Sequence, residues 1–193
     1  MATGTTMSSK RAFERAMRLA AVSGLRASFG PALLAAAYNR QNRRNWALAA
    51  VGEMVVDKLP GIPSRASLPL MAPRAVSGGY VAQQVMEREG IQDPWVAPMG
   101  AAVAAGVAAL APRLRGLLST VLGIPSPLVG LAEDYLALKI GAEALGMTMD
   151  DLKRIGQESI EDVQGLAEQA GVNVGPQIQQ LRDKIQSAGA GSM

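Results

Sequence analysis

The feature that most constrains this chain is a pair of carboxylates set inside an apolar run. Within Gly52–Arg65, Glu53 and Asp57 lie one helical turn apart, and a Pro-Gly-Ile-Pro turn follows them. Two like charges at this spacing destabilise a helix by about 0.2–0.5 kcal/mol in water, and by more where water is scarce. A buried arginine, a bound cation or a proton must therefore compensate them.

The apolar residues of the chain are small rather than bulky. The sequence is 49% hydrophobic but only 4% aromatic, and it contains 21 glycines. Helices rich in Gly and Ala can approach one another closely, which is typical of helix packing in lipid. Gly100, Ala104 and Ala108 repeat at this spacing within Val96–Ala111, which predicts a face that receives another helix. The same face makes a homo-oligomer a reasonable expectation.

The composition also excludes several kinds of chemistry. There is no Cys and no His, which rules out disulfides, thiolate nucleophiles, Cys/His zinc sites and histidine-based acid–base catalysis. The net charge is only +3 and few aromatic side chains are present to stack on bases, so nucleic acid is not an expected partner. Ser28 and Ser119 each lie near an arginine, but no base suited to activating a serine is identifiable. We expect no enzymatic activity, no cofactor and no metal.

Several apolar stretches suit a bilayer. Leu19–Tyr38 approaches the roughly 20 residues that a span needs, with Arg26 near its middle and a kink or break expected at Gly30-Pro31. Trp46–Leu59 is shorter, which suits a tilted, re-entrant or interior helix that ends at Pro60. Further apolar helices are expected over Leu70–Met86, over Val96–Ala111 with an end or kink at Pro112, and over Leu128–Leu145.

Charges inside these stretches need partners. A charge at the bilayer centre costs about 2.5–3.5 kcal/mol, so Arg26 must face the bundle interior and meet an acid. We expect one central site made of four acids and three arginines, which are Glu53, Asp57, Glu133 and Asp134, balanced by Arg26, Arg74 and Arg115. This site is either a place for a cation, proton or small solute, or a set of arginine–carboxylate pairs that fix helix register.

A duplicated pattern adds a second hypothesis. Leu25-Arg26-Ala27-Ser28 precedes the helix with Glu53, and Leu114-Arg115-Gly116 precedes the helix with Glu133. Inverted repeats around polar sites recur in transporters. Chance similarity in an Ala-rich sequence is the alternative interpretation.

Four short motifs between Leu19 and Leu145 carry a family resemblance. They are Ser23-Gly24-Leu25-Arg26, Gly52–Pro60 with its Asp57-Lys58-Leu59-Pro60, Pro73–Gly78, and Glu133-Asp134. Together they resemble a bacterial family of small integral membrane proteins catalogued as domain of unknown function 4126. The resemblance implies a helical, multi-pass protein of the bacterial inner membrane, and it implies no assigned activity.

The predicted fold is all-α, a multi-span membrane bundle of about four to five hydrophobic helices, some short or kinked. We expect a disordered N-terminus over 1–9, the helical membrane domain over 10–146 and a soluble tail over 147–193, with an amphipathic helix at Asp150–Ala170. The functional prediction is a transporter- or channel-like protein. The alternative is a non-catalytic structural or accessory subunit of a larger membrane assembly, which docks through its helices and tail. A soluble helical bundle is a third interpretation.

Overall fold

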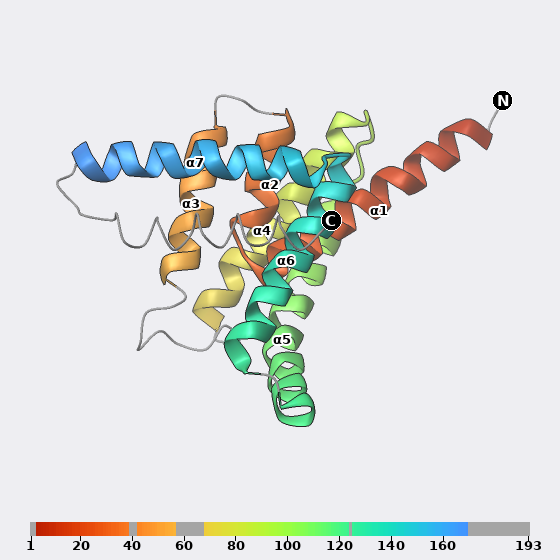
Figure 1. Cartoon of the computed structure of the whole chain (residues 1–193). Helices are drawn as coiled ribbons and strands as arrows, with labels where there is room; N and C mark the ends of the chain where they lie inside the picture. The colour runs from red at the N-terminus through yellow and green to blue at the C-terminus, as the bar shows by residue number, and fades with distance from the viewer. Residues whose placement is uncertain (1–2, 39–41, 57–67, 124, 170–193) are drawn as a thin grey trace. The chain divides into compact units, whose positions relative to one another are not determined.

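All regular secondary structure in the described part of the chain is helical, which confirms the predicted all-α class. The computed structural model describes residues 3–38, 42–56, 68–123 and 125–169 (Figure 1). The helices are α1 (Thr3–Leu25), α2 (Phe29–Tyr38), α3 (Arg43–Val56), α4 (Leu68–Arg88), α5 (Val96–Leu122), α6 (Ser126–Leu145) and α7 (Met149–Gln169).

The chain divides into two compact units. The first, Met1–Met147, contains α1 to α6, and the second, Thr148–Met193, contains α7. The boundary expected from the sequence was at residue 147. Asp57, Pro60 and the chain after Gln169 lie outside the described residues, so the expectations made for them have no structural counterpart here.

The core of the first unit is formed where α1, α4 and α5 pack backbone to backbone. A Cβ at Gly78 would lie 2.8 Å from the carbonyl oxygen of Gly100, and a Cβ at Gly24 would lie 2.5 Å from that of Ala104. Ala104 and Ala108 are fully buried. The small-residue face of α5 therefore receives helices of its own chain, as the spacing predicts, and is not available to a second copy.

The first candidate span is not one continuous helix. It is broken at Arg26–Ser28, whereas the sequence placed the break at Gly30-Pro31. Pro31 instead occupies the first turn of α2. Backbone N–H groups in a first turn have no intrahelical acceptor, so a proline there costs no helix hydrogen bond. A Cβ at Gly30 would overlap Ser23 Oγ, so this glycine lets α2 lie against α1.

Two other helix ends differ from the sequence-based expectation. α5 continues through Pro112 to Leu122, because the loss of one backbone hydrogen bond does not end a helix whose flanking turns favour it. α1 begins at Thr3, inside the segment 1–9 expected to be disordered. Helix propagation from an already packed turn costs little even through Thr, Gly and Ser, which explains this extension.

Among the described helices, only α5 is long and apolar enough to cross a bilayer, over Val96–Val121. Just 11% of its apolar window is buried inside the fold, unlike the core helix of a soluble protein. This supports membrane association. The other helices are shortened by the break after α1 or carry charges, so the multi-span bundle stays a prediction.

A buried charge network as candidate functional site

The break between α1 and α2 lies at the centre of a network of buried charges. Helices α3, α4 and α6 each direct a charged side chain to the break or to a residue bonded to it. Ser77 Oγ of α4 also donates a hydrogen bond to the Ala27 carbonyl oxygen within the break. We call the three ion pairs Arg26–Asp134, Arg74–Glu53 and Arg115–Glu133 the charge network.

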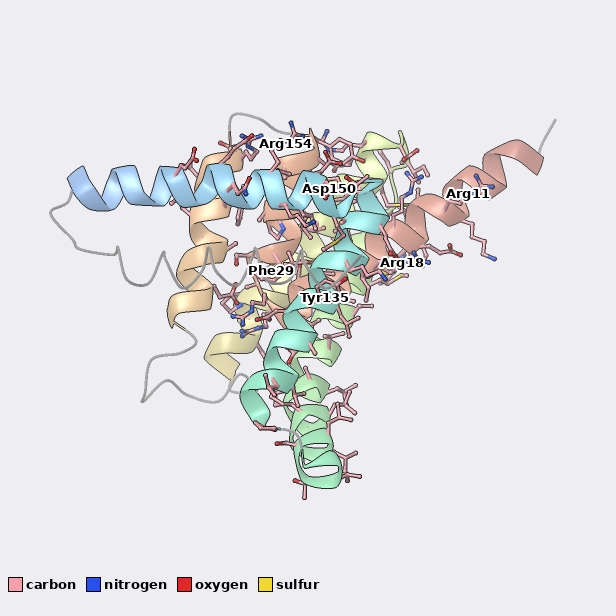
Figure 2. All side chains as sticks on the ribbon, viewed as in Figure 1. Arg11, Arg18, Phe29, Tyr135, Asp150 and Arg154 are labelled. Carbon is pink, nitrogen blue, oxygen red and sulfur yellow. The ribbon has the colours of Figure 1, made fainter. Side chains whose placement is uncertain are left out.

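Arg26 forms a bidentate ion pair with Asp134 of α6. Its Nε lies 2.9 Å from Oδ1 and its Nη2 lies 2.8 Å from Oδ2, the geometry in which the planar guanidinium matches a carboxylate best. The guanidinium carbon also lies 5.7 Å from the ring centroid of Phe29, which is labelled in Figure 2. Only 4% of Arg26 is exposed, so its charge is held almost entirely by protein groups.

The Glu53 side chain of α3 caps the N-terminus of another helix, α2. Its Oε1 accepts a hydrogen bond from the Ala27 backbone N–H at 3.0 Å, and its Oε2 accepts from the Ser28 N–H at 2.9 Å and from the Ser28 hydroxyl. These N–H groups stand at the positive end of α2 and have no intrahelical acceptor. Arg74, which is 3% exposed, adds a guanidinium contact at 3.4 Å. The Glu53 carboxylate thus accepts hydrogen bonds from the backbone of the break and pairs with the buried guanidinium of Arg74.

The third pair closes the base of the α5–α6 hairpin. Nη2 of Arg115 donates to Oε2 of Glu133. The guanidinium lies over Gly130, where a Cβ would be 3.4 Å from its central carbon, so the glycine leaves room for it. Because Glu133 and Asp134 are adjacent, one turn of α6 is tied both to α5 and to the end of α1.

The structure therefore brings together six of the seven charged residues predicted from the sequence. Each described carboxylate, Glu53, Glu133 and Asp134, contacts one of the predicted arginines, Arg74, Arg115 and Arg26. In the described part of the chain, no group of three or more acidic side chains is placed to hold a metal ion. The observed pairing is the arrangement expected if these residues fix helix register.

The halves of the proposed repeat use their arginines differently. Arg115 meets Glu133 of the following helix, whereas Arg26 crosses to Asp134 in the other half of the chain. Arg26 also lies in the break between α1 and α2, whereas Arg115 lies within the continuous helix α5. The two arginines are thus not structurally equivalent, and the inverted repeat stays a prediction.

Sequence analysis missed the backbone groups of the site. In the sequence, Ser28 is a candidate nucleophile and part of the duplicated Leu25-Arg26-Ala27-Ser28 pattern, whereas in the structure its N–H and hydroxyl both donate to Glu53. A Ser just before an apolar helix is a signal for a helix N-terminus and could have located the break.

Comparison with protein-family models, with curated proteins and with solved structures finds no match for this chain. The resemblance to the small membrane family noted from the motifs thus stays a prediction.

Proposed function

We propose that this protein is a membrane-associated, non-catalytic scaffold or accessory subunit whose helices are locked together by the charge network. The observation that supports this proposal is the pairing of every described acid of the predicted site with an arginine of the same chain. Opening a buried pair leaves an uncompensated charge, which costs about 3–5 kcal/mol. A network of this kind suits a rigid structural role.

The exposed apolar surface supports the membrane part of the proposal. Outward-facing side chains on α5 and α6 include Leu110, Leu114, Leu117, Leu136 and Ile140. Several exposed bulky apolar side chains on two helices are typical of a membrane or protein contact. Together with the resemblance to a bacterial inner-membrane family, this surface favours a protein that is bound to that membrane.

Cell fractionation tests the membrane location. We expect the protein to sediment with membranes, to resist washing with alkaline carbonate and to dissolve only with detergent. Recovery in the soluble fraction without detergent would contradict the proposal.

The scaffold role predicts a stoichiometric partner. We expect affinity purification of the full chain in mild detergent to retain one, and a chain lacking residues 148–193 to lose it, because α7 is a separate amphipathic unit. If the full chain carries no partner after cross-linking in membranes, the accessory role is wrong.

One observation favours a second candidate, a transporter for a cation or small solute. Transporters commonly place discontinuous helices at their binding sites, and α1 and α2 form such an interrupted pair with Glu53 at the gap. In proteoliposomes, this candidate predicts cation- or proton-dependent flux that is lost in Glu53→Gln and in Glu133→Gln while both variants stay folded. Absence of flux in the unmodified protein would exclude it.

A further inference from the structure

The end of the α5–α6 hairpin carries no charge. From Gly116 to Ala132 the sequence contains no acidic or basic residue, and we call this segment the hairpin tip. Gly123, with a left-handed φ of 64°, ends α5. In Figure 1 the ribbons of α5 and α6 run together toward this end of the bundle.

The hairpin tip exposes bulky apolar side chains on both of its helices. Val121 is 69% exposed and Leu117 is 58% exposed on α5, and Leu128 is more than half exposed on α6. Leu118, about 100° around the helix from Leu117, is exposed as well. A helix from a partner protein would cover one stripe of residues along α5. The exposed apolar side chains of the hairpin tip lie on both α5 and α6 instead. Such a surface fits fluid hydrocarbon better than a second protein.

The boundary of the hairpin tip suits a lipid headgroup region. Arg113, three residues before the tip, is exposed, and no acidic side chain in the described ranges pairs with it. Its guanidinium complements the negative charge of a lipid phosphate. The neighbouring Arg115–Glu133 pair neutralises the other charges at the base of the hairpin.

The length of the hairpin tip sets its depth. From Arg115 to Leu122 the helix rises about 10 Å at 1.5 Å per residue. One leaflet contributes half of a hydrocarbon core that is about 30 Å thick. A segment of this length enters one leaflet and does not reach the other.

We infer that the hairpin tip inserts into the hydrocarbon of a single bilayer leaflet, with Arg113 at the phosphates of that leaflet. The inference rests on the proposed membrane association and adds which surface enters the lipid and how far. It differs from a bundle whose whole flank is immersed, because exposed apolar side chains outside the tip, such as Leu110 on α5, Ile140 on α6 and Val76 on α4, would then meet lipid as well.

The absence of native cysteine allows a direct test. Val121→Cys and Val76→Cys, both at highly exposed valines, are labelled with an environment-sensitive fluorophore in the full chain. The proteins are reconstituted into phosphatidylcholine vesicles with phosphatidylglycerol, containing lipids that carry a nitroxide quencher near the headgroup or near the chain end. We expect severalfold quenching at position 121 and none at position 76.

Each other outcome has a distinct meaning. Equal quenching at both positions would overturn the single-leaflet inference and leave membrane association standing. Quenching at neither position, in protein that floats with the vesicles, would overturn the inference and indicate attachment through another surface. Protein that fails to float would overturn both the inference and the proposed location.

A second pair of variants, Val121→Asp and Val76→Asp, separates loss of membrane binding from loss of folding. We expect Val121→Asp to reduce flotation with these vesicles by about tenfold or more, because a charge in hydrocarbon is costly. The matched Val76→Asp should float normally, and circular dichroism should show the same helix content for both. Normal flotation of a folded Val121→Asp would overturn the inference.

Discussion

Arg26 shows how a single buried cation can organise a fold. Its guanidinium has lost nearly all contact with solvent and is compensated by a carboxylate on one side and an aromatic ring on the other. Desolvation makes such a pair a weak source of net stability compared with apolar packing. Its value lies in specificity, because only the native helix arrangement satisfies both charges.

Removing one partner of this pair should therefore be costly. We expect Arg26→Met to lower the free energy of unfolding by about 3–5 kcal/mol, since it leaves Asp134 buried without its cation. The half-exposed pair of Arg15 and Glu89, 3.1 Å apart, is the control, and Arg15→Met should cost about 1 kcal/mol or less. Thermal unfolding in detergent micelles measures both, and equal costs would show that the buried pair does not hold the bundle together.

Glu53 should control the attachment of α3. Glu53→Ala removes the acceptor of two backbone N–H groups and a hydroxyl, each unsatisfied group costing about 1–3 kcal/mol. We expect faster hydrogen exchange in α3 and in the first turn of α2, with α5 unchanged. Gly52→Ala, at a neighbouring site where a Cβ meets nothing within 4 Å, is the control and should leave exchange unaltered or slower.

At the scale of helices, the sequence predicts the existence of most elements but not where they break. The apolar runs place α3, α4 and α6 within a few residues of their observed ends, whereas α5 continues past the predicted end at Ala111 to Leu122. Ser28 before the apolar run is a local signal for the break at Arg26–Ser28. The carboxylate from α3 that stabilises the break is distant in sequence, so no local rule reveals it. The same limit applies to pairing, since sequence alone cannot choose between Glu53 and Asp134 as the acid that meets Arg26.

Close helix contact predicts opposite effects for the same substitution at two glycines. Gly78→Ala would push a Cβ to within 2.8 Å of the Gly100 carbonyl oxygen, and we expect a loss of about 1–3 kcal/mol from overpacking. Gly106→Ala meets nothing within 4 Å and should gain up to about 1 kcal/mol from higher helix propensity. Melting temperatures of the two variants test this, and a loss at both sites would contradict the packing described.

The start of α7 predicts a response to acid. Thr148 and Asp151 form a reciprocal capping box, in which the Thr148 N–H donates to Oδ2 at 3.0 Å and the Asp151 N–H donates to the hydroxyl at 3.2 Å. The hydrogen bond from the Thr148 backbone, followed by that from its side chain, lowers the pKa of Asp151 below its ordinary 3.8. The stabilisation is thus present above the ordinary value and is lost as pH falls through the lower folded value.

We therefore expect hydrogen exchange in the first turn of α7, corrected for intrinsic rate, to accelerate as the pH falls below 3.8. Asp151→Asn should remove most of this pH dependence. The neighbouring exposed Asp150 provides the control, and an identical effect of Asp150→Asn would argue against the capping box.

At the scale of the whole molecule, the division into two units predicts independent folding. The first unit, Met1–Met147, contains both the small-residue core and the charge network. A chain ending at Met147 should therefore melt within a few degrees of the full chain, in keeping with a change of less than about 1 kcal/mol. Aggregation or loss of cooperative melting on truncation would show that the second unit is needed for the fold.

The balance of the charge network has one further consequence. Each arginine is matched by a carboxylate, so the three pairs carry no net charge as a group. A membrane potential performs work of about 2.3 kcal/mol per 100 mV on an unbalanced elementary charge that crosses the bilayer. In a bilayer, it would perform almost none on these neutral pairs when they move together, so the three pairs would contribute no gating charge.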